Sequence, residues 1–390
     1  MNIVIGVTGG IAAYKIAELT SKLKKKNHQV QIIMTKNATE FITPLTLETL
    51  SNNKVMIDTF DRNFEYDVKH ISIAKKADLF VIAPCTANMI AKIANGIADD
   101  LLSTTVLATK SKVLVCPAMN TNMYTNQITQ DNINKLINYG FDVMETEKGL
   151  LACNDIGYGR LAAIDTIIEK IDYHLSNKVL NNKNIIISAG ATVEKIDKVR
   201  YITNHSTGKM GYALAKQAYN MGANVTLVSA NSKLKAPYGV NLVKVTSALE
   251  MYEYFKDNYQ KYDYLIKAAA VSDYTINNPK DYKIKKDQEF KLELIKTNDI
   301  LSYLGKNKKD HQVLVGFAME TENLIENATY KLINKNLDLI IANNLNDKGA
   351  GFGTDTNKVN IITKDEVKDI ELMSKDELSK EILLIMKGIK

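Results

Sequence analysis

The strongest constraint on the fold is an alternation of short apolar runs with helical segments, which occurs twice along the chain. In the first half, β-rich runs at residues 2–7 (NIVIGV) and 29–35 (QVQIIMT) flank a helical pattern at 11–26. Further apolar runs at 77–84 and 112–117 end at proline, as buried parallel strands often do. This alternation predicts a doubly wound α/β sheet.

The alternation stops and then starts again near the middle of the chain. The polar segment 172–184 (DYHLSNKVLNNKN) is followed by a new strand pattern at 184–192 and a helical pattern at 208–222. A chain of 390 residues is also long for one hydrophobic core. We therefore expect two doubly wound domains, residues 1–180 and 181–390.

The composition excludes several classes of protein. The net charge of +6 is mild and the lysines are scattered, which does not indicate a nucleic-acid surface but does suit small anionic ligands. The three cysteines are distant in sequence, so they predict neither a disulfide framework nor a paired metal site. No apolar run approaches the roughly 18 residues of a membrane span, and the N-terminus lacks the basic start of a secretory signal. We expect a cytoplasmic protein that binds neither nucleic acid nor membrane.

Ligands of doubly wound sheets bind at the carboxyl ends of the strands, so the residues directly after each apolar run are candidates. The candidate segments are Thr8-Gly9-Gly10, Thr35, Pro84-Cys85-Thr86, Pro117 to Asn120, Gly190-Ala191-Thr192, Ala268-Ala269-Ala270 and Gly316-Phe317.

The first candidate, GVTGGIAAYK, places Gly9 and Gly10 at the start of a helix. Small residues there let backbone N–H groups approach an anion, which the helix dipole also favours. The spacing is not G-x-G-x-x-G and no acidic residue stands at the position expected for a ribose, so dinucleotide binding is disfavoured. Phosphate or flavin-phosphate binding and a simple tight turn remain as alternatives.

Three side chains in the first half are candidates for chemistry, each with a plainer alternative. Asn120 offers an amide at a strand end, where Asn most often caps a helix. His70 lies at the expected start of a helix, where His is more often solvated or packed than catalytic. Cys153 lies in the bend-rich LACNDIGYGR, where an exposed thiol can act as nucleophile, redox group or general acid. Cys85 and Cys116 have apolar neighbours and are expected to be packed and unreactive.

The second half offers a nucleotide site. NHSTGKMG enters a helix but is not a P-loop, because Met210 follows Lys209. The small residues of AAAVSDY could lie against a flat base, with Asp273 available to a metal or the base. Lys283 and Lys285 would share one face if their segment is a strand. Binding of a triphosphate and a solvated basic edge strand are both compatible with that segment.

The motifs GVTGGIAAYK, HISIAKKADLFVIAPCTAN, PAMN, ACNDIGYGR, SAGAT, NHSTGKMG, AAAVSDY, KIKK and VGFAMET occur in this order. Together they resemble the bifunctional phosphopantothenoylcysteine decarboxylase / phosphopantothenate–cysteine ligase family of bacterial coenzyme A synthesis. The resemblance covers nearly the whole chain. It implies an N-terminal flavodoxin-like flavoprotein domain and a C-terminal Rossmann-like ligase domain. It also implies a homo-oligomer, with a dodecamer built from trimers and dimers satisfying both domains.

For the first domain, the resemblance implies FMN-dependent oxidation of the substrate's cysteinyl thiol to a thioaldehyde, loss of CO₂, and reduction of the resulting enethiolate. His70 would assist the oxidative decarboxylation, Asn120 would bind the substrate carboxylate, and Cys153 would donate a proton from a mobile Gly-rich loop. The residues expected to contact FMN are Gly9, Gly10, Ile11, Thr35, Thr86 and Asn88.

For the second domain, the resemblance implies activation of 4′-phosphopantothenate by CTP to an acyl-cytidylate, from which the amine of cysteine displaces CMP. Charge neutralisation by Mg²⁺ and lysines is expected. Asn204 would contact the acyl intermediate, Lys283 the triphosphate and Asp273 the metal. The residues expected at the CTP site are Lys267, Ala268, Ala269, Asp273, Lys283, Asn298, Asp299, Ile300, Leu301, Phe317, Lys331 and Lys335.

The sequence departs from the family pattern at turns. AGATVEKIDKVR lacks both prolines usual in that motif and TNDI lacks one, which predicts looser turns without loss of a reacting group. Asn154 stands where Gly is usual, and Asn tolerates left-handed backbone angles. A flavin- or nucleotide-binding regulatory protein without catalysis, like the decarboxylase-like phosphatase inhibitors, is the rival class. The presence of His70 and Cys153 argues against it.

Overall fold

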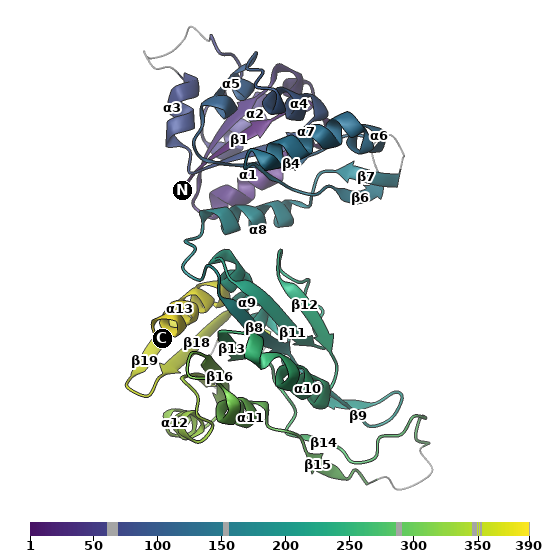
Figure 1. Cartoon of the computed structure of the whole chain (residues 1–390), viewed down its shortest axis with the longest axis vertical. Coiled ribbons are helices and arrows are strands. Elements are labelled where there is room, and N and C mark those ends of the chain that lie inside the picture. Colours follow the sequence, from purple (N-terminus) through teal and green to yellow (C-terminus); the bar gives the residue numbers. More distant parts are fainter. Residues whose placement is uncertain are drawn as a thin grey trace. The chain divides into compact units, whose positions relative to one another are not determined.

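The computed structural model describes residues 1–60, 69–150, 156–285, 291–344, 349, 351 and 353–389. The chain divides into two compact units, Met1–Leu175 and Ser176–Lys390. The division falls within the polar segment at which the sequence pattern restarts, and each unit contains its own parallel sheet covered by helices (Figure 1).

The first unit is built on a five-stranded parallel sheet with the order β2-β1-β3-β4-β5. Its strands are β1 (Asn2–Val7), β2 (Gln29–Met34), β3 (Leu79–Cys85), β4 (Lys112–Pro117) and β5 (Asp142–Val143). This is the flavodoxin-like order, in which the direction of winding reverses between β1 and β3. A ligand site is therefore expected where β1 and β3 end.

Helices cover both faces of this sheet. They are α1 (Ile16–Lys25), α2 (Pro44–Ser51), α3 (Lys69–Lys76), α4 (Ala87–Ala94), α5 (Leu101–Ala108), α6 (Thr121–Thr125), α7 (Gln127–Asn138) and α8 (Ile164–Leu175). Short 3₁₀ turns at Ile11–Lys15 and Lys36–Glu40 precede α1 and α2. The helix predicted at 11–26 therefore begins as a 3₁₀ turn.

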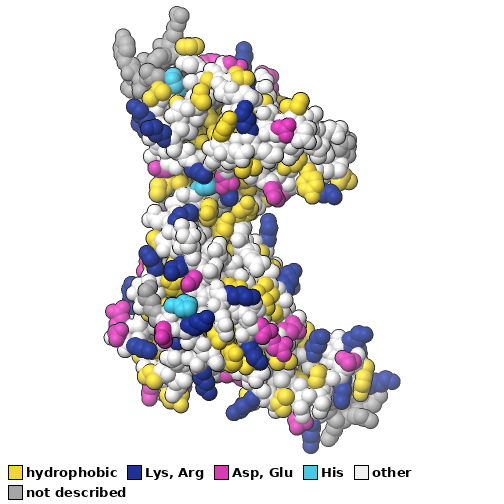
Figure 2. Space-filling model, viewed as in Figure 1, with side chains coloured by type: hydrophobic (Ala, Val, Ile, Leu, Met, Phe, Trp, Pro, Cys, Tyr) yellow, Lys and Arg dark blue, Asp and Glu magenta, His cyan; other side chains and the backbone are white. Residues whose placement is uncertain are grey.

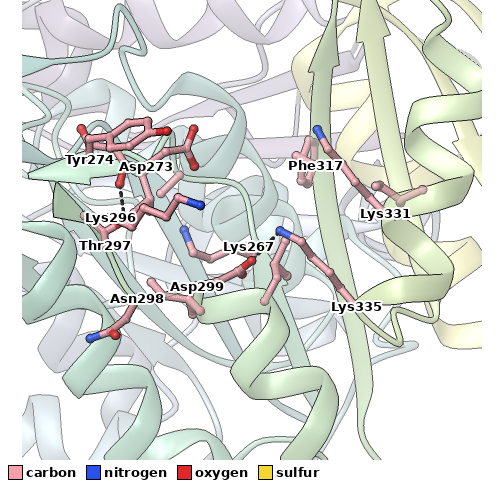
Figure 3. Close-up of a pocket in the computed structure, with 16 residues that line it drawn as sticks. Lys267, Asp273, Tyr274, Lys296, Thr297, Asn298, Asp299, Phe317, Lys331 and Lys335 are labelled. Carbon is pink, nitrogen blue, oxygen red and sulfur yellow. Dashed lines mark hydrogen bonds and ion pairs between the residues drawn. The ribbon is translucent and has the colours of Figure 1, made fainter. Parts of the chain in front are cut away.

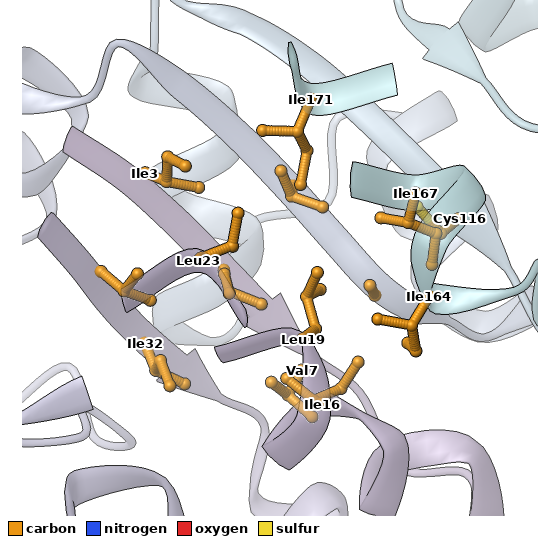
Figure 4. Packing of buried hydrophobic residues seen from close by; sticks show 14 of the residues in the cluster. Ile3, Val7, Ile16, Leu19, Leu23, Ile32, Cys116, Ile164, Ile167 and Ile171 are labelled. Carbon is orange, nitrogen blue, oxygen red and sulfur yellow. The ribbon is translucent and has the colours of Figure 1, made fainter. Parts of the chain in front are cut away.

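Apolar side chains spaced by three or four residues hold α1 and α8 against one face of the sheet (Figure 4). Leu19 and Leu23 of α1 and Ile167 and Ile171 of α8 are fully buried. They pack with strand residues such as Ile3 in one cluster, as an amphipathic helix on a sheet requires. A second cluster, which includes Phe80, forms the core under α4, α5 and α7.

The second unit contains an eight-stranded sheet with the order β12-β11-β8-β13-β16-β17-β18-β19. Its strands are β8 (Asn184–Gly190), β11 (Asn224–Ala230), β12 (Asn241–Val245), β13 (Tyr264–Lys267), β16 (Val313–Glu320), β17 (Leu339–Asn344), β18 (Thr356–Ile362) and β19 (Val367–Ser374). The first six positions are parallel and follow the Rossmann order, with the switch point between β8 and β13. β18 and β19 add an antiparallel edge that the alternation of strands and helices did not predict.

Helices also cover this sheet on both faces. They are α9 (Lys209–Asn220), α10 (Ala248–Asn258), α11 (Ile300–Asn307), α12 (Leu324–Asn334) and α13 (Lys375–Gly388), with a 3₁₀ turn at Tyr259–Lys261 after α10. One core contains Leu214 of α9 and Ile382 of α13. The other contains Phe255 of α10, Leu304 of α11 and Leu332 of α12.

Two short hairpins project from this sheet and are here called the arm (Figure 1). The first pairs β9 (Val193–Lys195) with β10 (Tyr201–Thr203), and the second pairs β14 (Tyr274–Ile276) with β15 (Leu294–Lys296). Lys283 and Lys285 lie on the connection between β14 and β15, outside any strand. These two lysines are therefore not placed on one face of a strand, as they would be if their segment were a strand.

None of the helices within the described ranges is long and apolar enough to cross a membrane.

A partly buried ionic cluster joins β5, the last strand of the parallel sheet in the first unit, to α8, the last helix of that unit. The carboxylate of Asp142, in β5, lies 2.9 Å from Lys170 Nζ and 2.7 Å from His174 Nε2, both on α8. Burial alone would raise the pKa of Asp142, but its bonds with His174 and Lys170 outweigh that effect and lower the pKa to about 2. The charged carboxylate therefore stabilises the folded state.

We expect Asp142→Asn to lower the free energy of unfolding of the first unit near pH 7 by about 2 kcal/mol. The stabilisation is present above the ordinary carboxyl pKa and is lost as the pH falls through about 2, so the variant should also be less sensitive to acid between about pH 4 and pH 2. Hydrogen exchange of the α8 amides in the full chain, together with acid titration, measures both effects. Asp165→Asn is the control, because the Asp165 side chain is 80% exposed in its pair with Lys22. Equal losses in the two variants would contradict the prediction.

Candidate active sites

In the first unit, the ends of β1, β2 and β3 are joined around the Gly9-Gly10 loop. The N–H of Thr35, after β2, donates to the carbonyl of Val7 at 3.0 Å. The hydroxyl of Thr8 donates to the carbonyl of Pro84 at 2.7 Å and accepts from the N–H of Thr86 at 3.0 Å. These bonds bring three of the predicted strand-end segments together at the switch point.

The loop packs closely against the segment that follows β2, and a hydroxyl of that segment is left without a partner among the described residues. A Cβ on Gly9 would stand 2.5 Å from Asn37 Cβ, so glycine is required for this close approach. Thr35 Oγ1 is buried and has no hydrogen-bond partner among the described residues. A buried hydroxyl without a partner is uncommon, and a phosphate oxygen would satisfy it. Of the other residues expected here, Ile11 and Asn88 are exposed and Thr86 is the N-cap of α4.

Asn120 follows β4 and caps α6, where its Oδ1 accepts from the N–H of Asn122 at 2.8 Å. Asn120 therefore caps a helix, which was the plainer alternative for this residue, and the bond to Asn122 orients its side-chain amide. The neighbouring Thr121 was missed by the sequence analysis, although its Oγ1 is buried and has no partner in the described part of the chain. No motif signals such a residue, because only packing reveals that its hydroxyl is unpaired.

The hairpin of β6 (Glu147–Leu150) and β7 (Ile156–Arg160) packs against the Asn120 segment. The N–H of Met119 donates to the carbonyl of Gly159 at 2.9 Å. A Cβ on Gly157 would lie 2.4 Å from Thr121 Oγ1, so the absence of a side chain permits the approach. Cys153, which stands between these two strands in the sequence, lies outside the described residues.

His70 lies in the first turn of α3 and is half-buried, as its sequence position predicted. Cys85 and Cys116 are fully buried, and burial raises the pKa of both thiols. The prediction that these two cysteines are packed is confirmed, and at neutral pH neither supplies a thiolate.

In the second unit, a cavity of about 410 Å³ opens near the carboxyl ends of β13 and β16 (Figure 3). Its lining contains most of the residues predicted for the nucleotide site, namely Lys267, Ala269, Asp273, Asn298, Asp299, Ile300, Leu301, Phe317, Lys331 and Lys335. Lys296 and Tyr274 also line it and were missed by the sequence analysis. Lys283 is exposed and does not line the cavity.

Lysines dominate the charge of this cavity. Lys335 lies 2.8 Å from the carboxylate of Asp299, and Lys331 pairs with Glu320. Asp299 also caps α11 by accepting from the N–H of Ser302. Lys267 and Lys296 have no ion-pair partner among the described residues, so the cavity suits a polyanion.

Lys267 is the buried member of this group, with 6% of its surface exposed at the end of β13. Burial lowers the pKa of its ammonium group to about 7, with opposing contributions from Asp299 and Lys335. A buried ammonium group without a carboxylate partner lowers the free energy of unfolding. Stability therefore does not explain why a lysine stands at this position, and a role in ligand binding or catalysis does.

A smaller cavity of about 140 Å³ adjoins the first and shares Ala269 and Phe317 with it. Its wall includes Ala268 and the start of α9 at Gly208 and Lys209. These are predicted segments that sequence alone could not place side by side. Asn204 lies nearby, where its Nδ2 donates to the carbonyl of Ala270 at 3.3 Å.

The opposite wall of the smaller cavity was missed by the sequence analysis. It contains Asn343, Asn357 and Lys375, all at least nine-tenths buried. Asn357 Oδ1 has no hydrogen-bond partner in the described part of the chain. Lys375 donates to the carbonyls of Gly351 and Thr354, and burial together with the charge of Lys209 lowers its pKa. They come from β17, β18 and the start of α13, segments that carry no recognisable binding motif.

Comparisons with known proteins agree with the two units. Residues 1–176 match the Flavoprotein family, and residues 180–389 match the family of the DNA/pantothenate metabolism flavoprotein C-terminal domain. The chain is 44% identical over 389 residues to the coenzyme A biosynthesis bifunctional protein CoaBC of Borreliella burgdorferi, covering 99% of this chain and 98% of that protein. It is 45% identical over 388 residues to CoaBC of Bacillus subtilis, covering 98% of this chain and 95% of that protein.

The chain belongs to the CoaBC family. It is a bifunctional enzyme of coenzyme A biosynthesis that combines a decarboxylase unit with a ligase unit. The resemblance inferred from the motifs is thereby confirmed. A crystal structure of the C-terminal domain of a CoaBC protein is 42% identical, covers 55% of this chain and 98% of that chain, and has a TM-score of 0.48.

The larger cavity of the second unit is lined by one carboxylate predicted to bind metal, Asp273, which is exposed. Within the described ranges, no group of three or more His, Cys, Asp or Glu side chains could hold a metal ion by itself. Any divalent cation at this site would need most of its ligands from a bound molecule or from water.

We expect Lys267→Met to raise the free energy of unfolding of the ligase unit near pH 7, by roughly 3 kcal/mol. The unfolded chain protonates this lysine below its ordinary pKa, while the folded chain does so only near pH 7, so the penalty is largest at or below pH 7 and disappears as the pH rises to about 10. Urea unfolding between pH 6 and pH 10 measures the difference. Lys296→Met is the control, because Lys296 is exposed in the same cavity. A loss of stability in Lys267→Met would contradict the prediction.

Proposed function

We propose that the decarboxylase unit binds FMN where β1, β2 and β3 end, and there converts 4′-phosphopantothenoylcysteine to 4′-phosphopantetheine. The unpartnered Thr35 hydroxyl supports this assignment, because it can donate to a phosphate oxygen beside the N–H groups of Gly9 and Gly10. The match to the Flavoprotein family supports it independently. Bound FMN would accept two electrons from the substrate's cysteinyl thiol and return them after CO₂ has left.

The remaining residues of this unit would bind substrate and move protons. The amide of Asn120, oriented by its bond to Asn122, carries N–H groups that can hold the substrate carboxylate. His70 would assist the oxidative decarboxylation. Cys153 would then protonate the product of decarboxylation. The packing of β6 and β7 on the Asn120 segment supports this role, because Cys153 lies between these two strands in the sequence.

We expect Cys153→Ser to retain FMN and ligase activity but to stop after CO₂ loss, because a serine hydroxyl is a much weaker acid than a thiol. The purified variant should be yellow and release CO₂ while 4′-phosphopantetheine fails to appear, which mass spectrometry of the products measures. Cys85→Ser is unsuitable as a control because that thiol is fully buried, so Ser176→Ala, outside both sites, serves instead. Wild-type release of reduced product by Cys153→Ser would refute the proton-donor role.

We also propose that the ligase unit binds CTP in the larger cavity and 4′-phosphopantothenate in the smaller one. The observation that carries this proposal is that the two cavities share Ala269 and Phe317. A carboxylate in one cavity can therefore approach the α-phosphorus of a nucleotide in the other. Its oxygen would attack that phosphorus and release pyrophosphate, and the amine of cysteine would then attack the acyl carbon, lose a proton and release CMP.

The lining of the larger cavity suits a nucleotide triphosphate. Lys267, Lys331 and Lys335 can neutralise phosphates, and the segment Asn298 to Leu301 brings the N-terminus of α11 to the cavity. Mg²⁺ would be carried by the triphosphate, with Asp273 as the protein ligand, since phosphate oxygens and water supply most ligands of a nucleotide-bound Mg²⁺. Lys283 would approach the triphosphate from the arm.

The smaller cavity suits 4′-phosphopantothenate. Lys209 and Lys375 provide positive charge, and α9 begins at its wall. The unpartnered Oδ1 of Asn357 can accept from a hydroxyl or amide N–H of the pantothenate portion. Asn204 donates to the carbonyl of Ala270, which lines the smaller cavity, so its side chain could contact an acyl intermediate bound there.

We propose that the enzyme is a homo-oligomer, with trimers formed by the decarboxylase units and dimers by the ligase units, and a dodecamer satisfying both. Exposed apolar side chains support association, among them Ile97 and Leu107 in the first unit and Tyr201, Leu294 and Ile295 on the arm. Figure 2 shows yellow apolar groups among the lysines of the arm. A cytoplasmic location, where the sparse thiols stay reduced, remains our prediction.

We expect Lys283→Gln to slow formation of the acyl-cytidylate by about tenfold or more, because a positive charge is lost from the developing pyrophosphate. Its KM for CTP should change less than its kcat, since Lys283 does not line the cavity. Release of pyrophosphate from CTP, with 4′-phosphopantothenate present and cysteine omitted, measures the step. Lys285→Gln on the same connection is the control for charge alone. Unchanged pyrophosphate release by Lys283→Gln would refute the assignment.

A further inference from the structure

Lys283 is exposed on the connection between β14 and β15 and does not line the larger cavity. Its proposed contact with the triphosphate therefore requires that this connection be held in place. The structure shows three hydrogen bonds that fasten this connection to the first hairpin of the arm. The N–H of Lys280 donates to the carbonyl of Ile196 at 3.0 Å. The N–H of Ile284 donates to Asp197 Oδ2 at 3.2 Å, and Arg200 Nη2 donates to the carbonyl of Ile284 at 3.1 Å.

Asp197 is the centre of this arrangement. Its side chain is fully buried, and its Oδ1 accepts from the N–H groups of Val199 at 2.8 Å and Arg200 at 2.7 Å. Its Oδ2 accepts from Arg200 Nε at 2.9 Å and from Arg200 Nη2. The bonds from Arg200 and these backbone groups hold the pKa of Asp197 well below its usual range, so it is a carboxylate at any working pH.

The Asp197–Arg200 pair therefore binds both polar groups of the Ile284 backbone. Because Lys283 directly precedes Ile284, the direction in which its side chain leaves the backbone depends on this pair. A second carboxylate joins the two hairpins of the arm to each other and to the start of α10. Glu194 Oε1 accepts from the N–H of Ala248 at 2.9 Å, and Glu194 Oε2 accepts from the hydroxyl of Thr275 at 2.8 Å.

We propose that Asp197 is a positioning residue for the ligase reaction: with Arg200 it holds Ile284 so that Lys283 is presented to the triphosphate. The inference rests on the proposed role of Lys283. Asp197 acts through Lys283 and does not line either cavity.

The two carboxylate oxygens of Asp197 make different bonds, so its positioning role can be tested separately from its structural role. Oδ1 closes the turn from 197 to 200, whereas Oδ2 receives Arg200 and the Ile284 N–H. Asp197→Asn retains an oxygen for the turn but places an NH₂ group where an acceptor is needed. Ile284→Pro removes the same bond from the other side, because proline has no N–H, and leaves Asp197 and Arg200 in place.

The test is a double-mutant cycle in the full chain, read out as pyrophosphate release from CTP without cysteine. Asp197→Asn should lower the single-turnover rate constant of pyrophosphate release about tenfold while CTP affinity stays within about twofold of wild type, and Ile284→Pro should do the same. Asp197→Asn combined with Lys283→Gln should be no slower than Lys283→Gln alone, because residues that act as one unit are not additive. Asp281→Asn, an exposed residue of the same connection, should behave as wild type.

Four results would overturn the proposal. A wild-type rate constant of pyrophosphate release in both Asp197→Asn and Ile284→Pro would show that the bond to Ile284 does not matter. A double variant slower by the product of the single effects would show independent action of Asp197 and Lys283. A wild-type rate in Lys283→Gln would remove the proposed role of Lys283 together with this inference, whereas a slow Lys283→Gln beside a normal Asp197→Asn removes the inference alone.

Discussion

Both units depend on one constraint: neighbouring parallel strands end at the same edge of the sheet. The loops that follow the strands, and the backbone groups left unpaired at the strand ends, therefore lie close together. At the switch points, between β1 and β3 and between β8 and β13, neighbouring loops turn to opposite faces and leave a crevice. Thr8 in the first unit, and Ala269 and Asp273 in the second, follow strands that end there, and Thr35 follows the neighbouring strand β2. The helices on both faces supply the burial that holds these edges in place. The chemistry is thus confined to loops, while the cores provide stability.

The sequence predicts the strands of this frame well, because buried parallel strands are continuous apolar runs and their ends carry small or polar residues. It also predicts which side chains follow those strands, including most of the larger ligase cavity. It does not predict β18 and β19, which follow no strand–helix alternation, or the arm, whose strands have only three residues each. Asn357, Lys375 and Thr121 were missed for a related reason. Their significance lies in burial and unpaired atoms, which arise from contacts between distant segments.

The turn from 197 to 200 is held by side-chain hydrogen bonds although it lacks the proline usual in the family. Residue 198 is lysine where the family turn usually has proline, and a looser turn was expected. In the structure this turn is closed by the Asp197 carboxylate, which accepts from the N–H groups of Val199 and Arg200. Proline limits the unfolded chain, whereas the carboxylate stabilises the folded turn directly. The same carboxylate then has a second oxygen free to hold the neighbouring hairpin, a link that proline cannot make.

Unpaired polar groups are concentrated where ligands are expected. Of the five buried side-chain atoms without a partner in the described part of the chain, Thr35 Oγ1, Thr121 Oγ1 and Asn357 Oδ1 lie at the two proposed sites. Lys267 adds a buried ammonium group without an ion-pair partner among the described residues. Each such group destabilises the protein without ligand by the free energy of an unmade hydrogen bond or an unpaired charge. Since a ligand that supplies the missing partner recovers that free energy, the same groups that lower stability favour binding, and both effects should be strongest at the two proposed sites.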